Sequence, residues 1–98
     1  MNKEKIIEIL RTVEDPEIRI DIHTLGLIYN IHLDEKSREV KILMTFTTPF
    51  CPYGDLILEE IKQKLEKGGF KKTDIELTFD PLWIPSVEIR EMLGMPSD

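Results

Sequence analysis

The sequence predicts an α+β domain of two layers, in which a small mixed sheet of about three strands carries helices on one face. Segments with the helical spacing of apolar residues are interspersed with segments in which apolar and polar residues alternate. The expected helices span residues 3–12, 52–67 and 87–93, and the expected strands span 26–33, 39–47 and 73–79. A turn of hairpin length joins the first two strands, which makes them antiparallel. The later order of strand, helix and strand makes a right-handed crossover, so the last two strands run parallel.

Length and composition favour one domain over residues 1–98 and exclude several classes of protein. The chain has 98 residues, a net charge of −6 and a sequence pI of about 4.9. This charge argues against nucleic acid and membrane partners, because phosphates and anionic lipids attract clustered Lys and Arg. No apolar run approaches the ~18 residues of a membrane span, and a single cysteine excludes an internal disulfide. We therefore expect a soluble protein of the cytoplasm.

The first helix leads into an acidic loop. Apolar residues at i, i+3, i+4 and i+7 give residues 3–12 one buried stripe, and Pro16 ends the helix. The loop holds two carboxylates, Asp15 and Glu17. Because Asp-Pro is ordinary turn chemistry, the loop is either a solvated acidic turn or part of a site. In both cases we expect its carboxylates to be exposed and to contribute little to stability.

Residues 18–33 combine an ambiguous segment with a clear strand. Isoleucines alternate with polar residues over 18–25, as in a short edge strand or an extended segment. His23 has no second ligand at a metal-binding spacing, so we expect it to be structural or exposed, and His32 to be exposed. In the strand 26–33 we expect Leu27, Tyr29, Ile31 and Leu33 on one face and Ile28, Asn30 and His32 on the other.

The centre of the chain ends a strand, turns tightly and begins a long helix, and this turn contains the only cysteine, Cys51. Pro49 and Pro52 stop the strand because neither donates a backbone N–H, and Pro52 suits the first turn of a helix. Cys51 is therefore expected at or next to the helix N-cap, where unpaired N–H groups and the helix dipole lower the pKa of a thiol. The alternative is a small buried apolar residue, as free cysteines often are.

A second loop bracketed by prolines, residues 80–85, contains the only tryptophan, Trp83. Because parallel strands end at the same edge of a sheet, we expect this loop beside Thr47, Thr48 and Cys51, and clefts at such edges often bind ligands. The apolar residues expected to face inward in the last strand and the last helix are Ile75, Leu77, Phe79, Val87, Ile89 and Leu93. Ser86 is expected to cap that helix.

A site that combines a thiol with hydroxyls and carboxylates suits metal handling better than hydrolysis. A cysteine nucleophile normally needs a positioned base, usually His, and nothing places His23 or His32 near Cys51. Thiolates select zinc, copper and iron–sulfur species. A closed zinc site needs four Cys or His ligands, which one chain does not supply. A Cys-dependent enzyme is therefore the least favoured interpretation.

Four stretches, taken in order, resemble a known family. They are Asp15-Pro16-Glu17-Ile18, Leu25-Gly26-Leu27-Ile28-Tyr29, the stretch from Met44 to Pro52, and Asp80-Pro81-Leu82-Trp83. Together they are similar to the SufT/PaaD-like family of iron–sulfur cluster assembly accessory proteins, which is shared with the eukaryotic cytosolic iron–sulfur targeting component. The resemblance implies a fold like the NifU C-terminal-type iron–sulfur assembly domain. The chain lacks the additional C-terminal cysteines of PaaD-type members, which argues against a PaaD proper.

The resemblance also implies a functional site without catalytic residues. Its members would be Asp15, Glu17, Thr47, Thr48 and Cys51. The expected topology, and not the resemblance, adds Asp80 and Trp83 as a wall of this site. Cys51 would be a reactive cysteine and a transient metal ligand. The expected ligand is a transient iron–sulfur cluster or iron, and none is stably bound by a monomer, because a cluster usually needs about four protein ligands.

The function expected from this family is that of a non-enzymatic accessory factor in iron–sulfur cluster assembly or delivery to apo-proteins. Its partners would be iron–sulfur scaffold or apo-target proteins, with no nucleic acid and no membrane, and a homodimer is a further expectation. The alternative is an assembly or interaction subunit of a multicomponent metallo-oxygenase, PaaD-like and acting in aromatic degradation. In that alternative Cys51 is only structural.

Overall fold

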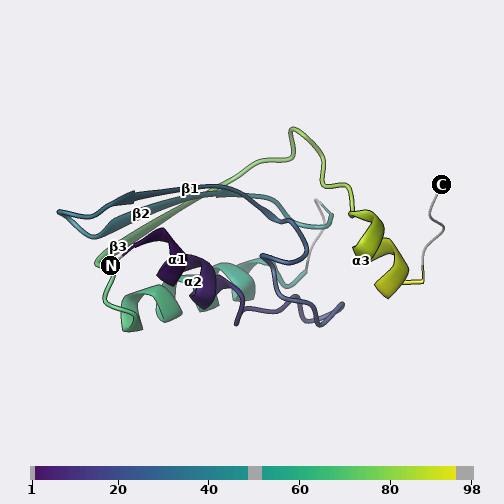
Figure 1. The fold of residues 1–98 in the computed structure, drawn as a ribbon, viewed down its shortest axis with the longest axis horizontal. Coiled ribbons are helices and arrows are strands. Elements are labelled where there is room, and N and C mark those ends of the chain that lie inside the picture. The colour runs from purple at the N-terminus through teal and green to yellow at the C-terminus, as the bar shows by residue number, and fades with distance from the viewer. Residues whose placement is uncertain (1, 49–51, 95–98) are drawn as a thin grey trace.

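The computed structural model describes residues 2–48 and 52–94 and confirms the two predicted layers. Along the chain the elements are α1 (Lys3–Leu10), β1 (Ile28–Asp34), β2 (Glu39–Met44), α2 (Gly54–Lys67), β3 (Lys72–Leu77) and α3 (Val87–Met92). The sheet lies over α1 and α2, and α3 lies beyond one end of these layers (Figure 1). Among the described residues, no helix combines the length and the apolar character needed to cross a membrane.

The sheet has the predicted mixed topology. Its three strands are in the order β1-β2-β3, with β1 antiparallel and β3 parallel to the central β2. Ile42 lies between Ile31 of β1 and Ile75 of β3. Ile31 and Ile42 are buried, so this row faces the helices and forms the centre of the core.

A β-bulge in β1 changes the predicted faces of Ile28 and Tyr29. Further along the strand the prediction is confirmed, because Ile31 and Leu33 pack in the core while Asn30 and His32 are exposed. Ile28 pairs with Met44 and Asn30 pairs with Leu43, so Tyr29 is an extra residue in β1. An extra residue shifts the alternation of side chains by one position. Ile28 therefore packs against the core instead of facing away from it. The strand also begins at Ile28, later than the expected residue 26.

The two long helices form the second layer and differ from the prediction mainly at their ends. The Asn2 side chain caps α1 by accepting the backbone N–H of Lys5, and the helix ends at Leu10, followed by a turn. The first residue of α2 is Gly54 and its N-cap is Tyr53. Pro52 therefore lies just outside the helix that it was expected to begin. Lys64 of α2 donates to the carbonyl of Thr12, just after the end of α1, at 2.9 Å, and this hydrogen bond links the two helices.

Residues 18–25 form turns, so the expected edge strand or extended segment is wrong. The segment contributes one isolated bridge, in which Asp21 pairs with Glu14. Asp21 also accepts the backbone N–H of Thr24 at 2.8 Å, which stabilises a turn. Ile22 and Leu25 are buried and face the core from these turns. The alternation of isoleucines thus reflects turns and not a strand, and Ile18 and Ile20 pack against the same core that buries Ile22.

The last strand and helix bury fewer apolar residues than predicted. Leu77 is 39% exposed because β3 is an edge strand, whereas Ile75 and Phe79 pack against the core as expected. Ser86 caps α3 as predicted by accepting the backbone N–H of Ile89 at 3.2 Å. Ile89 is buried, but Val87 and Leu93 are exposed. The reason is that α3 has six residues and lies past the end of the helical layer (Figure 1), so only Ile89 reaches the core.

Candidate functional site

One end of each of the three strands lies at the side of the sheet where the candidate site was expected, which we call the site edge. Ile28 at the start of β1 and Leu77 at the end of β3 both pair with Met44 at the end of β2. Hydrogen bonds continue the ladder past these pairs, from the N–H of Thr45 to the carbonyl of Leu27 and from the N–H of Thr78 to the carbonyl of Met44, both at 2.9 Å. The chain that leads to Cys51 therefore leaves from the centre of this edge.

Residues 78–85, which we call the strap, cross this edge from β3 to the beginning of β1. The Trp83 indole N–H donates to the carbonyl of Leu25 at 2.7 Å, and the Tyr29 hydroxyl donates to the carbonyl of Pro81 at 3.0 Å. Because β2 lies between β1 and β3, a strap bonded to the start of β1 passes the end of β2. The strap therefore lies at the same sheet edge as the start of the segment containing Thr47 and Thr48.

The strap begins with a tight turn at Asp80, a residue that we expected at the wall of the site. The Thr78 hydroxyl accepts the backbone N–H of Asp80 at 3.2 Å and donates to the Asp80 carbonyl at 3.3 Å. The Asp80 side chain is exposed, whereas Trp83 is half-buried. Trp83 thus anchors the strap through its indole N–H. Its position in the sequence did not indicate this role.

Phe46 forms the floor of this region, and the sequence analysis missed it as a positioning residue. Its ring lies 6.5 Å from the ring of Phe79, between centroids, at an interplanar angle of 56°. A Cβ atom added at Gly54 would come within 2.7 Å of the Phe46 ring. The signal in the sequence was a glycine in the first turn of a helix, where a side chain would normally be tolerated.

Of the two carboxylates in the acidic loop, Asp15 is buried, whereas Glu17 is exposed as expected. Asp15 is 3% exposed, so its expected exposure is wrong. Its Oδ1 atom accepts the backbone N–H groups of Glu17 at 2.9 Å and Ile18 at 3.2 Å. The Asp15 backbone also accepts the N–H of Arg19 at 2.7 Å and donates to the carbonyl of Ile20 at 3.0 Å. Asp15 therefore holds the turn together, and Glu17 is the carboxylate that this turn exposes.

The structure connects the acidic turn to the strap only through intermediate turns. The Asp21–Glu14 bridge follows the acidic turn, and the N–H of Leu25 donates to the Asp21 carbonyl at 3.0 Å. The carbonyl of Leu25 in turn accepts the Trp83 indole. Within residues 2–48 and 52–94, no hydrogen bond or ion pair joins Asp15 or Glu17 directly to Thr47, Asp80 or Trp83.

The two threonines and the cysteine complete the set of predicted site residues. Thr47 is half-buried and Thr48 is exposed, immediately after the floor residue Phe46. Cys51 lies outside the described residues. The N-cap of α2 is Tyr53, and the expected place of Cys51 at or next to the helix N-cap stays a prediction.

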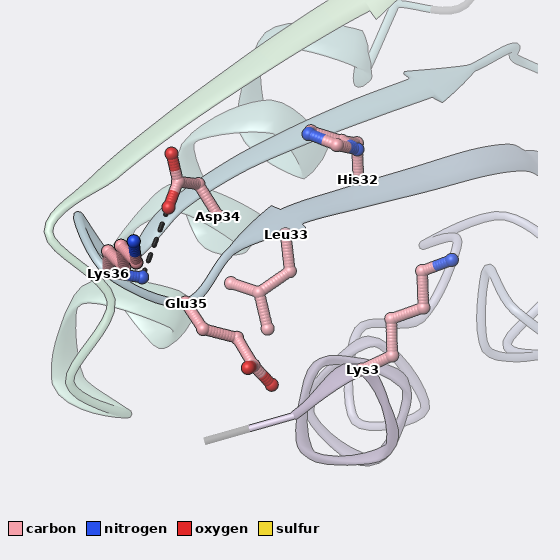
Figure 2. Close-up of a pocket in the computed structure, with 6 residues that line it drawn as sticks. All are labelled: Lys3, His32, Leu33, Asp34, Glu35 and Lys36. Carbon is pink, nitrogen blue, oxygen red and sulfur yellow. Dashed lines mark hydrogen bonds between the residues drawn. The ribbon is translucent and has the colours of Figure 1, made fainter.

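A hollow lies at the opposite end of the sheet. It has a volume of about 610 Å³ and is lined by residues from the start of α1 and from the β1–β2 turn, namely Lys3, His32, Leu33, Asp34, Glu35 and Lys36 (Figure 2). Asp34 accepts the backbone N–H of Lys36 at 3.0 Å and so stabilises the hairpin turn. His32 is exposed as predicted, and His23 is half-buried.

Neither end of the sheet assembles a metal-binding cluster from the described residues. Within 2–48 and 52–94, no group of three or more His, Cys, Asp or Glu side chains is arranged to hold a metal ion. The candidate site at the strap therefore stays a prediction.

Comparisons with known proteins relate this chain to proteins of iron–sulfur cluster assembly. The profile of the family described as "Iron-sulfur cluster assembly protein" matches residues 3–77. A relative from Porphyromonas gingivalis, named "Fe-S protein maturation auxiliary factor", is 44% identical over 82 residues, which cover 83% of this chain and 77% of the relative. "Fe-S protein maturation auxiliary factor SufT" of Staphylococcus aureus is 35% identical and covers 72% of this chain and 81% of its own length.

Solved structures agree with the fold described above. A conserved hypothetical protein from Thermotoga maritima superimposes with a TM-score of 0.83 at 40% identity, covering 97% of this chain and 96% of the other. The family match includes both the acidic turn and the segment from Thr47 to Cys51. Because the profile spans most of the chain and close relatives align over most of their length, this protein belongs to the iron–sulfur cluster assembly protein family.

Proposed function

We propose that this protein is an accessory factor that assists iron–sulfur cluster assembly or the delivery of clusters to apo-proteins. The observation that carries the proposal is the 44% identity, over most of the chain, to a relative named as an auxiliary factor of Fe-S protein maturation. The geometry is compatible with this role, because the strap and the central strand meet at the edge from which the cysteine-containing segment departs.

In this proposal the iron or the cluster is cargo and not a resident cofactor. A cluster usually needs about four protein thiolates or substitutes, and the sequence has one cysteine. A complex with a scaffold or an apo-target would supply the remaining ligands. Cys51 then acts as a transient ligand or thiol contact while the partner provides a permanent site, so the monomer needs no further soft ligand.

The remaining site residues take supporting roles in the proposal. Glu17 and the hydroxyls of Thr47 and Thr48 offer oxygen ligands or hydrogen bonds near the exchange site. Asp15 acts indirectly, because its buried carboxylate holds the turn that exposes Glu17. Asp80 and Trp83 form the wall on the strap. None of these residues is assigned a catalytic role, and the protein is proposed to work by docking in the cytoplasm.

Anaerobic reconstitution with iron and sulfide tests the proposal. We expect a labile, substoichiometric chromophore that a chelator removes and that is absent in Cys51→Ser, because a single thiolate does not retain a cluster. Maturation of a client iron–sulfur enzyme should also fall in Cys51→Ser. Thr73→Ser is the control, because it makes a small change at the hairpin end of the sheet, where Thr73 pairs with Val40.

Two outcomes would contradict the proposal in different ways. A stable cluster at full occupancy on a dimer would make the protein a carrier. No chromophore, together with normal client maturation by Cys51→Ser, would make Cys51 structural. That result would favour the alternative of an interaction subunit in a metallo-oxygenase system.

A further inference from the structure

The exposed apolar side chains of the described residues are gathered at one end of the molecule. Large apolar residues with at least 37% of their surface exposed are found at the start of α2, at the end of β3, in the strap and on α3. We call them the apolar end: Tyr53, Leu56, Leu77, Leu82, Ile84, Val87, Met92 and Leu93. Within residues 2–48 and 52–94, the hairpin end of the sheet has none of them.

Packing contacts connect two of the segments that carry the apolar end, the strap and the start of α2. Phe79 of the strap packs against Phe46, and Phe46 packs against Gly54, which lies between Tyr53 and Leu56 in the sequence. The teal start of α2, the strap and the yellow α3 all lie toward the same end of the molecule in Figure 1. The segments that carry these side chains therefore lie toward one end of the molecule.

The exposure of the strap residues follows from the way in which the strap is bound. Trp83 points inward, because its indole donates to the carbonyl of Leu25. In an extended segment the neighbours of an inward residue point outward. Leu82 is 63% exposed and Ile84 is 73% exposed for this reason. The hydrogen bonds of the strap thus hold two large apolar side chains in water, which costs free energy unless a partner covers them.

The same region carries most of the chain's excess negative charge. Residues 52–59 and 77–94 contain five carboxylates and one guanidinium, a net charge of −4 within a chain whose net charge is −6. These groups are Asp55, Glu59, Asp80, Glu88, Glu91 and Arg90. The carboxylates are exposed. The other twelve of the thirteen Lys and Arg residues lie outside these two segments.

We propose that the apolar end is a docking surface for a segment of a partner protein that presents apolar side chains flanked by Lys and Arg. Apolar anchors would cover Leu82 and Ile84, and the carboxylates around them would attract the flanking cations. The same carboxylates repel nucleic-acid and lipid phosphates. The inference rests on the proposed function only for the identity of the partner, which would be a scaffold or an apo-target docked next to the Cys51 segment.

The test uses the full chain and two synthetic helical peptides of about 14 residues, long enough for an amphipathic helix. One contains Leu and Lys, and the other has Glu in place of every Lys. Calorimetry should detect binding of the Lys peptide, with an affinity that falls as salt is raised, and no binding of the Glu peptide.

Variants locate the binding surface. Leu82→Ser combined with Ile84→Ser should raise the Kd of the Lys peptide by about tenfold or more, because apolar contact area is lost. Glu88→Lys combined with Glu91→Lys should also weaken binding. Glu35→Lys combined with Glu66→Lys makes the same change in charge at exposed residues away from the apolar end and should have a smaller effect. The substituted positions are exposed, and circular dichroism checks that every variant folds.

Several results would overturn the docking surface. These are no binding of the Lys peptide, equal binding of the Glu peptide, or unchanged binding by the Leu82 and Ile84 variant. A dimer that this variant converts to monomers would assign the surface to a second copy of the chain instead. Cys51→Ser should bind the peptide as the wild type does. Failure of docking with intact Cys51-dependent maturation, or the reverse, therefore identifies which of the two proposals is wrong.

Discussion

At the scale of single residues, Asp15 combines a place in the candidate site with a structural role. A buried carboxylate that accepts two backbone N–H groups organises its turn. Loss of that acceptor leaves the two donors without a partner, which costs more than the loss of an exposed charge. The resemblance in sequence identified the residue, and the structure assigns its effect to the geometry of the turn.

Substitution of Asp15 should therefore affect stability, contrary to the expectation for an exposed loop. Asp15→Ala is expected to lower the free energy of unfolding by about 1–3 kcal/mol. Asp15→Asn keeps an oxygen acceptor and should lose less. Glu17→Gln is the control, with a change within about 0.5 kcal/mol because its side chain is exposed. Urea unfolding measures all three, and equal stability of Asp15→Ala and wild type would show that the turn does not depend on this carboxylate.

Gly54 is a second residue whose role depends on packing. Replacing a helical glycine with alanine normally stabilises a helix by up to about 1 kcal/mol. Here the added Cβ would lie 2.7 Å from the Phe46 ring, so Gly54→Ala should instead destabilise the protein by about 1–3 kcal/mol. Thermal unfolding provides the measurement. Phe46→Leu in the same chain should restore part of the loss, and a stabilised Gly54→Ala would exclude the close packing.

At the scale of elements, the strap is the segment that gives the site edge its shape. Two side-chain hydrogen bonds join it to the beginning of β1, across 52 residues for Tyr29 and 58 for Trp83. The strap donates one of these bonds, from Trp83 to the carbonyl of Leu25, and accepts the other at the carbonyl of Pro81. The strap therefore depends on the position of β1, and the bulge at Tyr29 is part of that arrangement.

Removing one of these hydrogen bonds should loosen the strap without unfolding the sheet. Tyr29→Phe is expected to cost about 1 kcal/mol or less, as for a typical exposed hydrogen bond, and to speed amide exchange in residues 78–85. Tyr53→Phe removes the same hydroxyl from an exposed tyrosine and should leave this exchange unchanged. Hydrogen exchange with mass spectrometry makes the comparison. Identical exchange in both variants would mean that the Tyr29 hydroxyl does not hold the strap.

At the scale of the whole molecule, packing is uneven from one end to the other. Among the described residues, sixteen apolar side chains form one buried core, and α3 contributes only Ile89 to it. The rest of α3 extends beyond the two layers (Figure 1). Segments with few buried contacts open locally at low free energy. The α3 part of the apolar end is thus held by few buried contacts with the core.

We expect this difference to appear in native-state hydrogen exchange. Amides of α3 should exchange faster than those of α2, in which Ile57, Ile61 and Leu65 are all buried. The Lys-containing peptide should slow the exchange of α3 if it docks on the apolar end. Equal protection of α3 and α2 in the free protein would contradict the unequal packing.

The order and the types of the elements could be predicted from the sequence, because they depend on local patterns. Alternation in residues 39–44 and helical spacing in 54–67 are properties of neighbouring residues, and the structure confirms both. The crossover rule then determined the parallel pair of β2 and β3. Motifs identified the family, since four short stretches occur in the right order.

Only the tertiary structure decided the features that shape the candidate site. The bulge at Tyr29 changes the faces of Ile28 and Tyr29, because the register of β1 is set by the partner strand β2. The burial of Asp15, the anchoring of Trp83 on Leu25 and the contact of Gly54 with Phe46 each join residues through their environment in the fold. Periodicity describes neighbours along the chain, whereas these contacts depend on where distant backbone groups come to lie. The sequence therefore predicted which residues belong to the candidate site, and packing determined how the described ones are held.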